Sequence, residues 1–109
     1  MNELQDLKER LRIFSIERDW EQFHDPKNLA LALSIEAAEL NECFLWKNPE
    51  DAKKEKVQEE LADVFLYAIS LADKYDFDIH QICVDKINRN AEKYPVDKAK
   101  GTAKKYNEL

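Results

Sequence analysis

The sequence predicts an all-α fold, and two observations carry this prediction. The 109 residues include one glycine and three prolines, too few for a sheet protein that needs many tight turns. Ala, Leu, Glu, Lys and Gln dominate the longer runs, and these residues favour helix. With short connections and no internal repeat, the chain fits one domain, a bundle of four helices. Because so small a core stabilises weakly, we expect part of the apolar surface to be buried in an oligomer.

The first two helices are expected over residues 2–20 and 29–46. Apolar residues of the first recur at three- and four-residue steps, the spacing of one helix face: Leu4, Leu7, Leu11 and Phe14. This pattern breaks before Pro26, because the residue before a proline is disfavoured in the α region. Asn28 is a good N-cap, so the second helix should begin directly after it.

The third and fourth helices are expected over residues 49–75 and 78–94. Asn48 and Pro49, followed by two acids, form a favourable helix start. The fourth helix must stop near Pro95. Its buried face is predicted at five positions: Ile79, Ile82, Cys83, Ile87 and Ala91. The tail over residues 95–109 is expected to be partly extended.

The charge balance and the cysteines restrict the partners and the compartment. Lys and Arg number 17 against 23 Asp and Glu, a net charge of -6, which argues against nucleic acid as a partner. No apolar run approaches the roughly 18 residues of a membrane span, and the chain opens on a charged helix. Cys43 and Cys83 lie in apolar stretches and are expected to be reduced, buried thiols. We therefore expect a cytoplasmic protein with no membrane partner.

Four acidic residues form two similar pairs on successive helices. Glu36 and Glu39 are three residues apart, as are Glu60 and Asp63, so each pair shares one side of its helix. Glu36 also occupies a position where the apolar period of its helix calls for a hydrophobic residue, and a charge there needs a partner. Four converging carboxylates would repel one another unless divalent cations neutralise them.

Two other interpretations of these acids compete with a metal site. Helical acids commonly lie on solvated faces and pair with lysines such as Lys56, and the pattern alone leaves this open. A di-iron bundle would need two Glu-x-x-His motifs, but the chain has only the one from Glu21 to His24, so we reject it. If metal is bound, oxygen ligands favour Mg²⁺, Mn²⁺ or Ca²⁺ over Zn²⁺.

The spacing of the acids resembles the metal motif of the MazG-like nucleoside triphosphate pyrophosphohydrolases. In that family four acids in this arrangement, two pairs separated here by residues 40–59, bind Mg²⁺. The resemblance is closest to the dCTP pyrophosphatase branch and covers nearly the whole chain. Further segments look like hallmarks of that branch: residues 17–24, 26–29, 44–47, 93–95 and 105–109.

The resemblance implies a Mg²⁺-dependent enzyme, with Mn²⁺ as a substitute, that hydrolyses a deoxynucleoside triphosphate to the monophosphate and pyrophosphate. The substrate would be dCTP or a modified dCTP, removed as a form of nucleotide-pool house-cleaning, by a homodimer or homotetramer. Glu36, Glu39, Glu60 and Asp63 would hold the metal. We assign catalysis to Glu39 and Glu36, with Glu39 as either the base that orients water or an inner-shell ligand.

The resemblance also implies a substrate pocket. Trp20 and Trp46 should border the base, since aromatic faces stack on any base, although core packing is an equal alternative for a tryptophan. Other residues match positions that line the pocket or contact sugar and phosphates: His24, Asn28, Tyr67, Lys86 and Asn90. For each of these five, a surface, capping or core role is the alternative.

One residue departs from the family pattern. Leu11 stands where vertebrate-type dCTP pyrophosphatases have a histidine, so a strict preference for cytosine is in doubt. A broad-specificity deoxynucleotide pyrophosphohydrolase therefore remains an alternative, and so does a nucleotide-binding helical module without turnover.

Overall fold

The computed structural model describes residues 2–109, and within that range every regular element is helical. This confirms the all-α prediction. Four long helices are present: α1 (Glu3–Glu17), α2 (Pro26–Glu42), α3 (Lys54–Lys74) and α4 (Ile79–Lys93). A short helix and three 3₁₀ turns complete the described chain: α5 (Val96–Ala99), η1 (Glu21–Phe23), η2 (Pro49–Asp51) and η3 (Tyr106–Glu108). The chain divides into two compact units, the first ending at Phe77 and the second beginning at Asp78.

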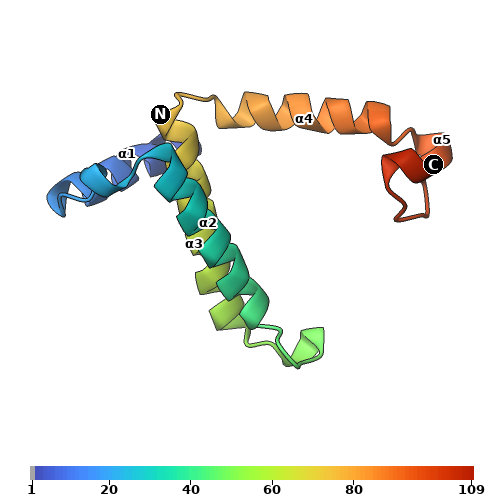
Figure 1. The fold of residues 1–109 in the computed structure, drawn as a ribbon, viewed down its shortest axis with the longest axis horizontal. Coiled ribbons are helices and arrows are strands. Elements are labelled where there is room, and N and C mark those ends of the chain that lie inside the picture. Colours follow the sequence, from blue (N-terminus) through green and yellow to red (C-terminus); the bar gives the residue numbers. More distant parts are fainter. Residues whose placement is uncertain (1) are drawn as a thin grey trace. The chain divides into compact units, whose positions relative to one another are not determined.

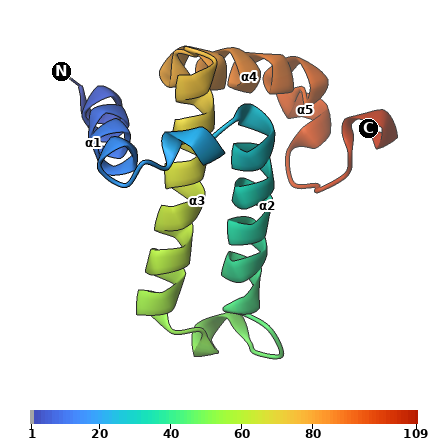
Figure 2. The ribbon, with the colours of Figure 1, turned by 60° about the vertical axis from the view of Figure 1, so that its left-hand side comes forward.

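The first unit is built on the antiparallel pair of α2 and α3, which lie side by side along their lengths (Figure 1 and Figure 2). The helix α1 also packs on α3. The main apolar contacts lie near the start of α2 and the end of α3, where Leu29 is 1% exposed and Ile69 is 5% exposed. Apolar burial at this end leaves the middle of the α2 and α3 pair free for polar side chains.

The helix α2 begins three residues before the expected start. Asp25 is its N-cap, and the Asp25 carboxylate accepts a hydrogen bond from the backbone N–H of Asn28 at 2.8 Å. Pro26 occupies the first helical position, where its fixed φ fits and no N–H is needed. The expectation that Asn28 caps this helix is therefore wrong. The helix ends at Glu42 rather than near residue 46, and Trp46 has a positive φ of 60° in the loop that follows.

The other helices of the first unit are shorter than expected. The helix α1 ends at Glu17, and Asp19 then turns the chain with a φ of 56° before Trp20. Pro49 starts only the 3₁₀ turn η2, because Ala52 and Lys53 adopt extended backbone angles. The helix α3 therefore starts at Lys54 instead of residue 49.

The second unit follows the predicted boundaries within one residue. The Asp78 carboxylate caps α4 by accepting a hydrogen bond from the N–H of Gln81 at 3.0 Å. The predicted burial of its apolar face is wrong for Ile82 and Ile87, which are 44% and 65% exposed, and for Ala91, which is also exposed. The tail, expected to be partly extended, forms α5 and η3, and residues 102–105 between them belong to no helix.

The two cysteines, both predicted to be buried, differ in exposure. Cys43 is buried and Cys83 is exposed, and both are free thiols; burial of Cys83 was therefore a wrong prediction. Among residues 2–109, no helix has the length and hydropathy needed to cross a membrane.

Candidate active site

Three of the four predicted acids meet between α2 and α3. Glu36 comes from α2, and Glu60 and Asp63 come from α3; one carboxylate oxygen of each lies within 4.8 Å of the other two. We call these three residues the acidic cluster. The antiparallel packing of α2 on α3 brings the two predicted pairs to the same level. Glu60 is only 7% exposed, so the cluster is not a solvated surface patch.

Glu39 lies at the edge of the acidic cluster and is more exposed. The pKa of Glu39 is raised to about 7. The largest causes are a hydrogen bond with Glu36 and the negative charge of Glu36, and Glu60 contributes in the same two ways. The carboxyl group therefore keeps its proton well above the usual range for a glutamic acid. Crowding of carboxylates, rather than burial, is the main cause.

The oxygens of the acidic cluster are only partly compensated. Lys56 Nζ lies 2.9 Å from Glu60 Oε1 and lowers the pKa of Glu60 through this hydrogen bond. The second oxygens, Glu36 Oε2 and Glu60 Oε2, are buried without a hydrogen-bond partner among residues 2–109. Buried carboxylate oxygens without a partner cost free energy. The lysine pairing that competed with the metal interpretation thus exists, but it satisfies one oxygen of one acid.

A pocket of about 220 Å³ adjoins the acidic cluster. We call it the α1–α3 pocket, and its lining comes from α1, from α3 and from the segment that leads into α2: Leu11, Phe14, Ser15, Trp20, His24, Asp63, Leu66, Tyr67 and Ser70. Asp63 belongs both to the acidic cluster and to the lining of this pocket. The pocket therefore has a carboxylate at one end and mainly apolar side walls.

The predicted pocket residues Trp20, His24 and Tyr67 all line this pocket. Trp20 meets Phe14 edge to face at 5.7 Å between ring centroids, and His24 at 6.5 Å. Burial, then the charges of Glu36 and Asp63, raise the pKa of Tyr67. Its phenol therefore keeps its proton and can donate a hydrogen bond.

The structure does not bring the remaining predicted residues to this pocket. Trp46 is 94% exposed in the α2–α3 connection, which lies at the opposite end of α2 from the segment joining α1 and α2 (Figure 2). The Asn28 side chain donates to Phe23 O at 3.3 Å and to Asp25 Oδ2 at 3.1 Å, a local role. Lys86 and Asn90 lie four residues apart on α4 in the second unit, and their part in a site stays a prediction.

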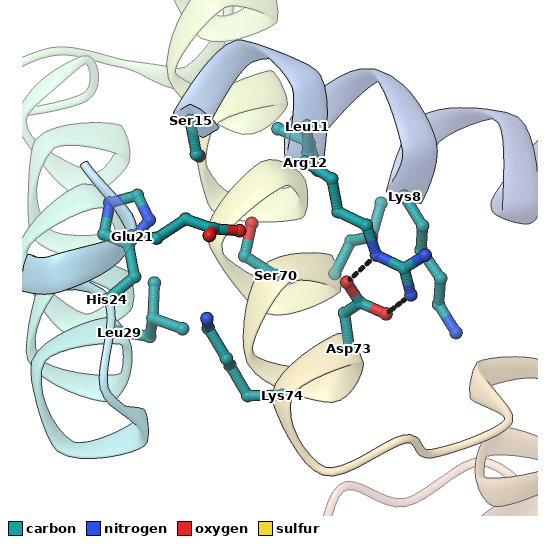
Figure 3. Close-up of a pocket in the computed structure, with 11 residues that line it drawn as sticks. Lys8, Leu11, Arg12, Ser15, Glu21, His24, Leu29, Ser70, Asp73 and Lys74 are labelled. Atoms are coloured by element: carbon teal, nitrogen blue, oxygen red, sulfur yellow. Dashed lines mark hydrogen bonds and ion pairs between the residues drawn. The ribbon is translucent and has the colours of Figure 1, made fainter. Parts of the chain in front are cut away.

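Sequence reasoning missed part of the lining of this pocket. Ser15 and Ser70 line it and also a smaller adjoining pocket of about 30 Å³, shown with its neighbours in Figure 3. Phe14 was placed with the apolar residues on one face of the first helix, and it forms a pocket wall. A signal for Ser70 was present, because seven residues separate it from Asp63 and two helical turns return to the same face.

Comparisons with known proteins find relatives along most of the chain. The model of the MazG-like family matches residues 31–109. The chain is 40% identical to dCTP pyrophosphatase 1 of Mus musculus and 38% identical to that of Homo sapiens, over 97% of this chain and 67% of each relative. A crystal structure of a pyrophosphatase from Archaeoglobus fulgidus superposes with a TM-score of 0.80 and 36% identity, over 87% of this chain and 94% of that one.

The family model covers both acid pairs, and the alignment with the relatives covers 97% of the chain. The resemblance proposed from the acids and the hallmark segments is confirmed by these matches. The chain belongs to the MazG-like family.

Proposed function

We propose that this chain hydrolyses a deoxynucleoside triphosphate, with dCTP or a modified dCTP preferred, to the monophosphate and pyrophosphate. The enzyme is a nucleoside triphosphate pyrophosphohydrolase that serves nucleotide-pool house-cleaning. One observation carries the proposal: the α1–α3 pocket shares Asp63 with the acidic cluster. A base in the pocket would thus place its phosphates beside carboxylates suited to metal ions. The names of the relatives, dCTP pyrophosphatase 1, support the same substrate.

The acidic cluster and Glu39 would hold Mg²⁺, with Mn²⁺ as a substitute. The residues fit a hard cation because all donors are carboxylate oxygens, and because Glu36 Oε2 and Glu60 Oε2 are buried without a partner in the described chain. When bound, Mg²⁺ supplies charge neutralisation for the triphosphate and a lower pKa for an attacking water.

The side chains of the chain itself bind and orient the substrate. Trp20 and Phe14 offer aromatic faces or edges to a base, and their apolar surface excludes water from it. Tyr67 lines the same pocket as Asp63 and keeps its phenol protonated, so it can donate to a sugar or phosphate oxygen. In its ionised form, Glu39 would either orient the attacking water and take up its proton or serve as an inner-shell metal ligand, with Glu36 beside it.

We also infer that the protein acts as a cytoplasmic homodimer or homotetramer. Large apolar side chains are exposed on several helices: Ile13, Ile16, Leu31, Ile35, Phe65 and Ile87. Such exposure favours association with another copy. Lys86 and Asn90 would contact the sugar or phosphates in the complete site. Light scattering coupled to size-exclusion chromatography should give two or four times the 12.9 kDa mass of the chain; a monomer would contradict this inference.

The decisive experiment measures pyrophosphate release from each dNTP and rNTP, with Mg²⁺ and with EDTA. Release that depends on Mg²⁺ and is fastest with dCTP would support the proposal. Similar rates for all deoxynucleotides would favour the broad-specificity alternative. Binding of dCTP without release of pyrophosphate would identify a binding module and contradict the proposed activity.

A further inference from the structure

The α3 wall of the α1–α3 pocket carries a polar side chain at each end. Asp63 lies at one end of its α3 wall and Ser70 lies seven residues further along the same wall. At 1.5 Å per residue, this separation is about 10 Å. The distance from the α-phosphate of an extended nucleotide to the far edge of its base is comparable. Phosphates held near Asp63 therefore place that edge beside Ser70.

The hydroxyl of Ser70 has a defined direction. It donates its proton to the carbonyl oxygen of Leu66, one turn earlier in α3, at 2.9 Å. The lone pairs of the hydroxyl oxygen remain available, so Ser70 can accept a hydrogen bond from a ligand but has no proton to give. Ser15, on the α1 side of the pocket, has no hydrogen-bond partner for its hydroxyl among residues 2–109. Its hydroxyl can donate or accept as the ligand requires.

We propose that Ser70 is a specificity-determining residue that selects bases presenting an amino group, such as cytosine, over bases presenting a carbonyl oxygen at the same position. The inference rests on the proposed function and concerns the base end of the same site. An exocyclic amine donates to the Ser70 oxygen. A carbonyl oxygen at that position places its lone pairs against those of Ser70, which leaves a polar atom of the base without a partner.

Ser70→Ala tests this inference through the ratio of kcat/KM for dCTP to kcat/KM for dUTP, two substrates that differ at C4 of the base. Loss of one neutral hydrogen bond should lower this ratio roughly 3- to 10-fold. Ser15→Ala should leave the ratio unchanged, because a hydroxyl that is free to rotate serves both bases. Ser34→Ala is the control outside the pocket, since Ser34 donates to Leu31 O at 2.7 Å in the same way on α2.

Calorimetric binding of dCMP and dUMP gives the same comparison without turnover. A wild-type protein that binds dCMP more tightly than dUMP, with the preference reduced in Ser70→Ala, supports the inference even if no pyrophosphate is released. The absence of release would then count against the proposed activity alone. An unchanged dCTP to dUTP ratio and unchanged dCMP to dUMP preference in a folded Ser70→Ala protein would overturn the role of Ser70.

Discussion

At the scale of single residues, the acidic cluster contains carboxylate oxygens that have no hydrogen-bond partner among the described residues. A period of 3.6 residues placed Glu36 on the apolar face of its helix, and the structure leaves Glu36 Oε2 buried with no partner in the described chain. Lys56 reaches Glu60 but not both of its oxygens. A cation is the simplest group that could satisfy acids from two helices at once.

Replacing Asp63 by Asn should abolish turnover while the helices remain folded. Asp63 is the residue that the acidic cluster and the α1–α3 pocket share, so its charge is needed where the substrate phosphates would lie. We expect kcat/KM to fall by at least about 100-fold, with an unchanged circular dichroism spectrum. Glu59→Gln is the matched control, because that acid is exposed on the same helix. Full activity of Asp63→Asn would contradict the assignment.

Adding Mg²⁺ should stabilise the protein independently of any substrate. Binding to the folded state alone contributes about 2.7 kcal/mol when the free ion is at 100 times its Kd. Tm measured by scanning calorimetry should rise with Mg²⁺ and return to its starting value with excess EDTA. Asp63→Asn should show little of this rise. A wild-type Tm that stays unchanged in millimolar Mg²⁺ would argue against a bound metal ion.

At the scale of elements, the sequence located all four long helices but misplaced several of their ends. Asn28 was expected to cap α2, but Asp25, directly before the proline at the first helical position, is the observed cap. Pro49 began a 3₁₀ turn because the following residues are extended, which the proline signal alone does not specify. Helix ends depend on these small local preferences, whereas the helix interiors are fixed by many residues in register.

The N-cap of α2 should contribute measurably to stability. Asp25→Ala removes the acceptor for the backbone N–H of Asn28 and a partner of its side chain, and should lower the free energy of unfolding by about 1 kcal/mol. Chemical denaturation with urea measures the difference. Asn48→Ala is the matched control, because Asn48 precedes η2 without a side-chain capping hydrogen bond. Equal losses in the two variants would show that the cap contributes nothing specific.

At the scale of the molecule, the residue pattern predicted the acidic cluster, whereas the pocket residues Trp20, His24 and Tyr67 were expected only through the family resemblance. A short connection makes α2 and α3 antiparallel neighbours, so the acid pairs on their facing sides had to converge. The position of α1 across α3 depends on side-chain packing between residues distant in sequence, which no local period encodes. For the same reason, the lining role of Ser15 and the separation of Trp46 from Trp20 were not foreseen.

One contact between α1 and α3 is an ion pair between residues 61 positions apart. Arg12 donates from Nε to Asp73 Oδ2 at 2.8 Å and from Nη2 to Asp73 Oδ1 at 2.6 Å (Figure 3). Paired hydrogen bonds of this kind fix direction as well as distance. Because Ser15 and Phe14 lie within one turn of Arg12, the pair also positions the α1 wall of the pocket.

Arg12→Gln should therefore lower Tm by a few degrees at neutral pH and weaken nucleotide binding. The hydrogen bonds from Arg12 lower the pKa of Asp73 below its ordinary 3.8, so the stabilisation is complete above that value and is lost as the pH falls through the lower folded-state pKa. The difference in Tm between wild type and variant should accordingly shrink below about pH 3.8.

Arg10→Gln is the control for this prediction, because Arg10 pairs at 2.9 Å with Asp6 inside α1 and crosses to no other helix. Local exposed pairs contribute little to stability, so Arg10→Gln should change Tm less and leave nucleotide binding intact. If the two variants instead had equal effects on Tm, the cross-helix pair would be no more than a surface contact. Another contact would then have to hold α1 in place, and the hydrogen bond from Lys8 Nζ in α1 to Phe77 O, just after α3, at 3.2 Å is one that the structure offers.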